Sequence, residues 1–591
     1  NQSCVGNNEQ EVTCLSDNNF YLYDCVEGML ISPVYLTSIE SPNCEISFQK
    51  SVSKELRYSN LIYEMKASKF ASSDFDYVYG ETFDPLNTEI LGENYSPTQN
   101  ARRYNYFLPY IELWDHSTNS INTNISVNKE YEYYLPNLQW FKLDEISVTD
   151  KMSSGSPLIL QFNLNYSENS AQRLTLNSLT EYYNTETTGK VYNFSYNQID
   201  KLPPYLSLKT DHWGFYNDYL SPVNSSCSDL LQTKNMNPDV IQYGILNEII
   251  YPTGGCTQFI FEPNDYLYKV NDNLWGNLLY TSKTQGGGIR IKTIINYPDG
   301  KSRPDTKSEK NYFYRLNFPN SATSSSGVLN AVPKYEFMVN SLQLNDNNNY
   351  TTVTSLVTSY QSVLPQSTNS ADCNVGYSEV TEVNSDGSYT RNVFSNHNSS
   401  SCYSNGFYLE FNDYKDEQFI SSIGGCISPY TPVISKASQR GKLLMQEVHS
   451  NSKLIAQNFN YYQTISNPNS VIKSLKLGVS SVCNASAYFY NGVAYTIPSY
   501  SYLPTDVISI SYDSEENPTI KTTTYEYNDY KQIKSETTIN SDNLIHRTYL
   551  KYVSDLNITS SQTDWLNSIL AMKRLNMIEY PVEVIKTVQS Q

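Results

Sequence analysis

Alternation of apolar and polar positions is the main pattern of this chain, and it is clearest near the middle. Two runs of alternating β-branched and aromatic residues, 245–251 and 257–268, are separated by Pro252-Thr253-Gly254-Gly255. Proline presets φ for a turn and glycine accepts positive φ, so the segment predicts a β-hairpin. Gly286-Gly287-Gly288 leads into another such run at 289–295, where consecutive glycines predict a turn or a β-bulge.

The same alternation recurs on both sides of this hairpin. Runs at 141–148, 158–166, 174–183 and 191–196 are separated by Ser, Asn, Thr or Gly and predict a meander of antiparallel strands. Asp386-Gly387 predicts a hairpin turn before a strand at 389–394. Three further strands are expected at 520–527, 532–539 and 544–552. One helix is expected, capped by Thr563-Asp564 and ending near Arg574, and we expect it to cover the last sheet.

Composition supports an all-β class with little helix. The 53 tyrosines and the 13% aromatic content suit pleated strands and polar turns. A chain of 591 residues is too long for one core, so we expect several consecutive antiparallel β-sheet domains, built as sandwiches or curved sheets. The expected domains are a disulfide-stapled N-terminal β domain at 1–135, a β-meander and hairpin domain at 136–340, a β domain at 341–500 that starts with an Asn/Ser-rich loop, and a hairpin region with the C-terminal helix at 501–591.

Net charge and hydropathy restrict the partners. The formal charge of −19 repels phosphate backbones and anionic membranes, so we expect no nucleic-acid partner. No apolar run approaches the roughly 20 residues that a membrane-spanning helix needs. The chain starts at Asn1 without an initiator methionine or an apolar leader, so we expect any signal peptide to have been removed. A lipid anchor upstream of Asn1 stays open.

The ten cysteines show neither C-x-x-C spacing nor clustering with histidine, which argues against a zinc site. Scattered cysteines in a Tyr- and Asn-rich β chain are typical of an oxidising compartment, where one disulfide adds about 2–4 kcal/mol. We expect several disulfides, and buried free thiols are the alternative. Neighbour pairing of Cys4 with Cys14 and of Cys25 with Cys44 is expected, although four cysteines allow three connectivities. The others are Cys227, Cys256, Cys373, Cys402, Cys426 and Cys483.

A search for reactive constellations finds none of the common catalytic motifs, and we expect no catalytic, cofactor-binding or metal-binding residues. The histidines lie far apart: His116, His212, His397, His449 and His546. Asp211-His212 is the best polar candidate, but the aromatic residues after it predict a packing corner at Trp213 and Tyr216 in which Asp211 binds backbone amides. Asp513, Glu515 and Glu516 predict a solvated acidic loop, with calcium binding as the alternative.

Short motifs follow one another in order over residues 140–591. They are Asp211-His212-Trp213-Gly214-Phe215-Tyr216-Asn217, Tyr251-Pro252-Thr253-Gly254-Gly255, Phe259-Ile260-Phe261-Glu262-Pro263-Asn264, Gly287-Gly288-Ile289-Arg290-Ile291, Asp386-Gly387-Ser388-Tyr389, Arg440-Gly441-Lys442-Leu443-Leu444, Thr523-Thr524-Tyr525-Glu526-Tyr527-Asn528 and Asn576-Met577-Ile578-Glu579-Tyr580-Pro581. In these motifs the chain resembles the YD-repeat or RHS-like surface proteins of Bacteroidota. The resemblance implies an exported, surface-associated β-rich protein, in some relatives lipid-anchored. The chain lacks the long run of glycine-containing YD repeats and the terminal core segment of the toxin-carrying RHS relatives.

Three function classes follow. We favour a non-enzymatic scaffold or subunit of an outer-membrane-associated complex, located at the outer-membrane surface or outside the cell, whose aromatic-rich faces contact a protein partner. The alternative is an adhesin or glycan-binding module, in which Trp114, Trp140, Trp213 or Trp275 stacks on sugar rings. A further alternative is the delivery portion of an RHS-type toxin, which requires additional sequence beyond Gln591.

Overall fold

The computed structural model describes the chain in segments. These are residues 3–5, 35–53, 114–115, 120–121, 141–153, 155, 157–168, 173–184, 187–203, 209–219, 233–270, 278–320, 324–330, 334–344, 350–363, 373–397, 401–404, 407–410, 417–418, 433–434, 436–450, 452–465, 471–481, 488–541, 544–556 and 564–590.

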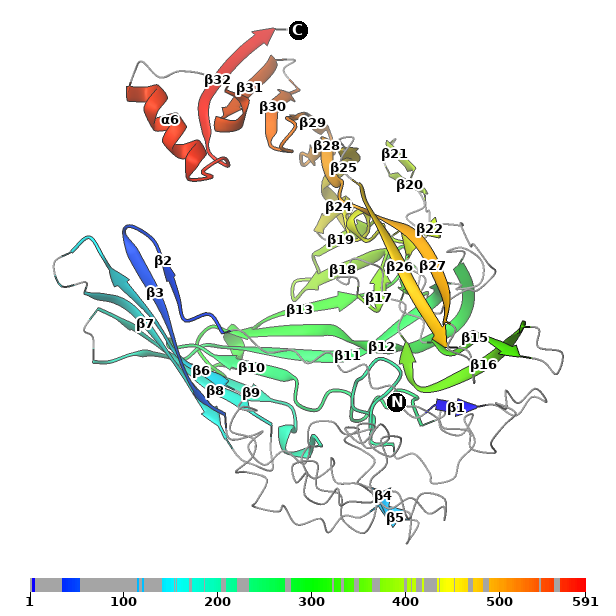
Figure 1. Ribbon diagram of the computed structural model, residues 1–591. Helices are drawn as coiled ribbons and strands as arrows, with labels where there is room; N and C mark the ends of the chain where they lie inside the picture. The colour runs from blue at the N-terminus through cyan, green and yellow to red at the C-terminus, as the bar shows by residue number, and fades with distance from the viewer. Residues whose placement is uncertain are drawn as a thin grey trace.

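One sheet of 21 strands runs through most of the described chain and curves as it goes (Figure 1). Nineteen of its strands pair in chain order: β2 (Ser38–Glu40), β3 (Cys44–Val52), β6 (Phe141–Asp150), β7 (Leu158–Ser167), β8 (Thr175–Tyr183), β9 (Lys190–Tyr196), β10 (Leu246–Ile250), β11 (Cys256–Val270), β12 (Leu278–Tyr297), β13 (Ser308–Phe313), β18 (Glu379–Asn384), β19 (Tyr389–Phe394), β24 (Leu443–Ser450), β25 (Lys453–Ile465), β28 (Ser501–Tyr512), β29 (Pro518–Tyr527), β30 (Ile533–Ile539), β31 (Leu544–Tyr552) and β32 (Pro581–Ser590).

The pairing in this sheet is antiparallel except at one branch. There β14 (Gly327–Leu329) pairs in parallel with β11, and β17 (Val375–Tyr377) pairs antiparallel with β14. Among the described strands, β2 pairs only with β3 and β32 pairs only with β31, so this sheet has two ends and does not close. The predicted all-β class is confirmed.

The remaining described elements are short or lie in separate small sheets. The strands are β1 (Ser3–Val5), β15 (Lys334–Leu344) and β16 (Tyr350–Val363) in a three-stranded sheet, and the pairs β4 (Trp114–Asp115) with β5 (Ser120–Ile121), β20 (Ser401–Ser404) with β21 (Phe407–Glu410), β22 (Glu417–Gln418) with β23 (Val433–Ile434), and β26 (Val471–Ser481) with β27 (Tyr488–Pro498). Short 3-10 turns are η4 (Ile199–Lys201), η5 (Pro304–Thr306), η6 (Ala437–Gln439) and η7 (Val553–Asp555).

The central hairpin forms as its sequence predicts. Ile250 lies opposite Cys256, and the Tyr251 amide donates to the Gly255 carbonyl at 2.8 Å. Gly254 closes the turn at φ +85°, a conformation that strains any residue with a Cβ atom. Strand β11 nearly coincides with the predicted run 257–268, whereas β12 begins eleven residues before the predicted run 289–295, because it continues to pair with β11.

The three glycines lie inside β12 rather than before it, and they form the predicted β-bulge. The register between β11 and β12 shifts between Pro263 and Asp265, opposite this segment. Gly286, Gly287 and Gly288 adopt φ values of +156°, +78° and +102°. These values are accessible to glycine at little cost, so the bulge depends on this residue type.

The predicted meander, the Asp386-Gly387 hairpin and the three C-terminal strands are also confirmed. The predicted helix is α6 (Asp564–Arg574), which buries Ile569 and contacts η7. It is the one α-helix of the described residues. The domain boundaries stay predictions. Pairing of β13 with β18 and of β25 with β28 joins strands on either side of residues 340 and 500.

The best-packed part of the sheet combines an apolar row and a polar row on the same face. Val393, Met445, Phe459 and Ile508 lie opposite one another on neighbouring strands, and the first three are at most 5% exposed. Two residues along each strand, and therefore on the same face, lies a second row of Arg391, Glu447, Gln457 and Ile510. A charge that is buried beside apolar side chains requires an oppositely charged or hydrogen-bonding partner.

None of the three cysteines whose side chains are described, Cys44, Cys256 and Cys373, is in a disulfide. Cys256 is buried, and Cys44 lies at the start of β3 with its Sγ 3.3 Å from the Ser41 hydroxyl. The expected Cys25–Cys44 bond is therefore wrong, because the β2–β3 turn directs Cys44 towards Ser41. The described part of the chain contains no disulfide. Cys14, Cys25, Cys227, Cys426 and Cys483 lie outside the described residues, as do the side chains of Cys4 and Cys402.

Candidate functional site

A buried ion-pair cluster joins β11, β12 and β17 at the branch of the sheet. The guanidinium of Arg290 donates to both carboxylate oxygens of Asp265, at 2.6 and 3.1 Å, and to Glu262 at 2.8 Å. It also donates to the hydroxyl of Tyr377 at 2.8 Å and lies 4.3 Å from the ring centre of Tyr314. A second contact to Glu262, at 2.7 Å, is an ion pair. Four hydrogen bonds and this ion pair therefore engage the guanidinium of Arg290 within the protein.

The electrostatics of this cluster favour the ionised forms. Burial opposes charge on Asp265, but the hydrogen bonds from Arg290 and Ser325 outweigh it and lower the pKa of the carboxyl. Burial alone would likewise lower the pKa of Arg290, and Asp265 reverses that shift. Burial raises the pKa of Tyr377. The Tyr377 hydroxyl donates to Asn264 at 3.0 Å and accepts from Arg290, so these hydrogen bonds join β17 to β11 and β12.

A second buried arginine joins β18, β19 and β24. Arg391 donates to both oxygens of Glu379, at 2.9 and 2.8 Å, and to Glu447 at 2.9 Å. The network continues, because Gln457 donates to Glu447 at 2.9 Å and Tyr512 donates to Gln457 at 2.8 Å. Each carboxylate is less than 10% exposed. The two acids thus share one buried cation and hold four neighbouring strands in register.

Sequence reasoning did not select either arginine. For Arg391 the sequence did contain a signal. Tyr389, Arg391 and Val393 point to the same face of β19, so a charge stands on a face that is otherwise apolar. In the first case Arg290 stands between Ile289 and Ile291, which places it on the opposite face from both. Only the partners show that these charges are buried and satisfied.

The polar candidate Asp211 forms the predicted packing corner. Its Oδ1 accepts the backbone N–H groups of Trp213 and Phe215, each at 2.9 Å. Burial raises the pKa of this carboxyl to about 6, against the opposing effect of those amide donors. Trp213 and Phe215 then pack against the glycine bulge, because a Cβ added at Gly286 or Gly288 would lie 2.7 or 2.6 Å from their rings. The motif is therefore architectural.

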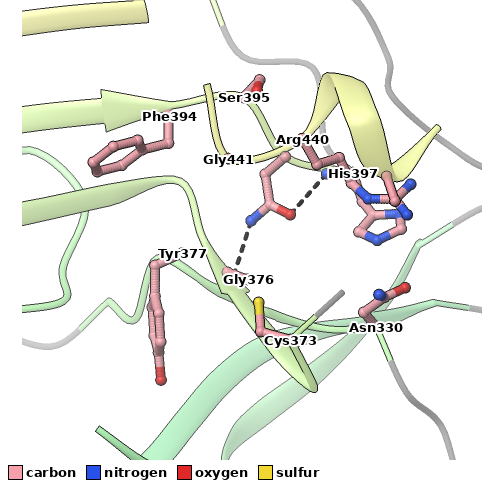
Figure 2. A pocket seen from close by; sticks show the side chains of 11 residues that line it. Asn330, Cys373, Gly376, Tyr377, Phe394, Ser395, His397, Arg440 and Gly441 are labelled. Atoms are coloured by element: carbon pink, nitrogen blue, oxygen red, sulfur yellow. Dashed lines mark hydrogen bonds between the residues drawn. The ribbon is translucent and has the colours of Figure 1, made fainter. Parts of the chain in front are cut away.

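A pocket of about 290 Å³ lies beside this branch, where β17, the end of β19 and η6 meet (Figure 2). Asn396 links two of these segments, since its amide donates to the Gly376 carbonyl at 2.9 Å and its oxygen accepts the His397 amide. Figure 2 shows Cys373, Tyr377, His397 and Arg440 around the cavity. No carboxylate is among the described lining residues.

The remaining sequence candidates occupy separate structural positions. His212 meets Trp213 edge-on, His449 stacks on Tyr389 with ring centres 4.3 Å apart, and His546 lies on β31. His116, Trp140 and Trp275 lie outside the described residues, as does the side chain of Trp114. The described residues contain no group of three His, Cys, Asp or Glu side chains suited to a metal ion.

The acidic loop at Asp513 is stabilised by hydrogen bonds from its own backbone amides. Asp513 accepts the amides of Glu515 and Asn517, each at 2.9 Å, and Glu516 lies 3.4 Å from Lys453. These contacts lower the pKa of Asp513, the side-chain hydrogen bond from Asn517 contributing most. The structure thus gives the loop the geometry of a turn, as the solvated-loop interpretation expects.

The C-terminal end of the sheet has the most exposed apolar surface of the sheet edges. Nine of the ten residues of β32 are exposed, including Val584, Ile585 and Val588 at 50%, 43% and 62%. Trp565 and Leu575, in and just after α6, are 54% and 71% exposed. Figure 1 shows α6 beside β31 and β32 at this end. Valine and isoleucine point to both faces of β32, and its outer edge has no neighbouring strand among the described residues.

Comparison with known proteins does not assign the site. No protein-family model matches the chain, and no curated protein sequence matches it. Among the described residues, no helix is long and apolar enough to cross a membrane. The functional argument therefore rests on the geometry of the sheet and its surfaces.

Proposed function

We propose that this protein is a non-enzymatic scaffold or subunit of a complex at the outer-membrane surface, and that a protein partner binds along β32. The observation that supports the proposal is the exposed apolar edge strand at the end of the sheet. Its export, its surface location and its relation to RHS-like proteins rest on the sequence resemblance and belong to the same proposal.

The physical reason lies in the chemistry of an open strand edge. No strand of the described residues pairs with the outer edge of β32, so its backbone N–H and C=O groups can recognise an added strand. Soluble proteins usually protect such edges with charges, prolines or bulges. Here the charged residues of β32 are Glu583, which pairs with Lys551, and Lys586, and Pro581 stands only at its start. Apolar residues on both faces would then be covered by the side chains of the incoming strand.

The absence of enzyme activity is part of the proposal. The two buried arginines are saturated by carboxylates, and Asp211 is engaged with backbone amides. Each of these groups has a structural contact that explains it. Trp213 packs against the glycine bulge, and the side chains of Trp114, Trp140 and Trp275 lie outside the described residues. Among the described tryptophans, the glycan-binding alternative falls to Trp565, which is 54% exposed.

A pull-down with a matched pair of variants tests the proposal. The tagged protein is captured from gently solubilised outer-membrane fractions, and companions are quantified by mass spectrometry. Ile585→Lys on the open edge is compared with Ile455→Lys, a similarly exposed position on β25, which is paired on both sides. We expect a stoichiometric companion that is lost with Ile585→Lys and retained with Ile455→Lys. Capture of the protein alone, or equal loss with both variants, would contradict it.

A further inference from the structure

A cavity of about 220 Å³ opens beside the Arg290 cluster, and cations outnumber carboxylates in its lining although the chain as a whole is negatively charged. Its charged lining residues are Lys283, Arg290, Lys292, Arg315, Glu262 and Asp265. Four cations thus face two carboxylates in a chain whose net charge is −19. A local excess of cations in a concave site attracts anions, because the walls exclude water and concentrate the field.

Part of this charge is already used inside the protein. Arg290 makes four hydrogen bonds to protein acceptors, and Asp265 accepts two of them. The second oxygen of Asp265 also lies 3.3 Å from the ammonium of Lys283. Asp265 is therefore neutralised by two cations and does not repel a bound anion strongly. These contacts form a rigid floor for the cavity rather than its ligand-binding groups.

The side chain of Lys292 remains available to bind a ligand in the cavity. It is exposed on β12, two residues after Arg290 and on the same face, and it forms no ion pair with any described residue. Lys283 is 55% exposed and directs one contact to Asp265, which leaves further N–H donors of its ammonium group for a ligand. Two ammonium groups and the side-chain amide of Gln285 thus line the cavity.

We propose that this cavity binds a small oxyanion, that is, a carboxylate, sulfate or phosphate group, through Lys283 and Lys292. An oxyanion has several acceptor lone pairs for the ammonium donors, and charge-assisted hydrogen bonds of this kind are stronger than neutral ones. The cavity is smaller than the 300–1,000 Å³ that is usual for drug-sized ligands, so it suits a single anionic group. The anion is either free in solution or carried by an acidic sugar.

Calorimetric titration at low ionic strength tests the proposal with four probes: inorganic phosphate, inorganic sulfate, glucuronate and glucose. We expect binding of at least one anionic probe and none of glucose. Binding should weaken about tenfold in Lys292→Gln, because one charged hydrogen bond is lost, and it should weaken as salt is added. Lys534→Gln is the control, since Lys534 is an exposed lysine on β30 outside the cavity.

The pattern of binding identifies the source of the anion. Equal binding of phosphate, sulfate and glucuronate indicates a free oxyanion, whereas preference for glucuronate indicates an acidic sugar. Both outcomes support the proposal if Lys292→Gln weakens them and Lys534→Gln does not. Unchanged binding in Lys292→Gln, glucose binding as tight as glucuronate binding, or no binding of any anionic probe would overturn it. An unchanged thermal midpoint of Lys292→Gln shows that the variant is folded.

Discussion

Substitution of Gly288 by alanine tests whether the bulge in β12 depends on glycine for two separate reasons. The first is its backbone conformation, since φ is +102°. The second is space: a Cβ atom would lie 2.6 and 2.8 Å from two ring carbons of Phe215. Real Cβ atoms do not approach other heavy atoms so closely, so Phe215 or the backbone of β12 must move.

The two contributions have known magnitudes. A non-glycine residue at a strained φ costs of order 1–3 kcal/mol. Overpacking a close contact adds typically about 1–3 kcal/mol. Gly288→Ala should therefore lower the local free energy of opening by about 2–6 kcal/mol. Gly387→Ala is the matched control, because its φ is +82° and no atom lies within 4 Å of an added Cβ. It should cost only about 1–3 kcal/mol.

Hydrogen exchange followed by mass spectrometry is the suitable assay. A chain of this length does not unfold in one step, so a single global free energy would be poorly defined. Exchange reports opening strand by strand, and peptides from β11 and β12 are compared with peptides from β18 and β19. The expected result is faster exchange around β12 in Gly288→Ala, and a smaller effect around β18 and β19 in Gly387→Ala.

A rescue experiment separates the contact from the backbone strain. In a Phe215→Ala background the ring is gone, so adding Gly288→Ala should destabilise β12 by less than it does in the native background. The difference is the coupling free energy of the pair, expected at about 1–3 kcal/mol. The reasoning is refuted if Gly288→Ala and Gly387→Ala have equal effects, or if Phe215→Ala gives no relief.

Three further predictions follow from buried groups. Burial raises the pKa of Asp211 from 3.8 to about 6, so the folded state holds the carboxyl proton more tightly than the unfolded state does. The resulting stabilisation of the folded state, of order 3 kcal/mol, is complete below pH 3.8 and is lost as the pH rises through 6. Asp211→Asn should remove this pH dependence from the opening free energy that hydrogen exchange gives for peptides around residue 211 at pH 4 to 7, and an unchanged dependence would exclude Asp211 as its source. Arg391→Met leaves two buried carboxylates without their cation and should destabilise by about 3–5 kcal/mol, whereas Lys551→Met, in an exposed pair, should cost less than about 1 kcal/mol. Equal changes in the opening free energies of β19 and β31, measured by hydrogen exchange, would contradict this. Cys256, 4% exposed, should react with a thiol reagent only after non-reducing denaturation, and continued protection there would mean that it is bonded.

Most strands could be predicted because their signals are local. Alternation over five to ten residues defines the faces of a strand, and Asp386-Gly387 or Pro252-Thr253-Gly254-Gly255 supplies the turn chemistry between two such runs. The helix at Asp564–Arg574 was predictable for the same reason, from its cap and the basic residues in its last turn. Each of these elements is encoded within one short window of sequence.

The candidate site was predictable only in part. That Asp211 would bind backbone amides follows from its position before a turn, but its partners in packing do not. Gly286 and Gly288 accommodate the rings of Trp213 and Phe215, which come from a segment far earlier in the chain. Likewise Arg290 meets Tyr377 across 87 residues. The local sequence pattern gives no sign of either contact, because these side chains can pack against each other only after their strands have paired.

The sequence by itself determined the all-β class, the positions of most strands and the residue types of the turns. The tertiary structure decided that these strands join into one continuous open sheet, that two buried arginines hold it in register, and that β32 is left as its exposed edge. The physical reason is that alternation selects which face of a strand is buried. Backbone hydrogen bonds can form between any two strands, so packing between residues far apart in the chain decides which strands pair.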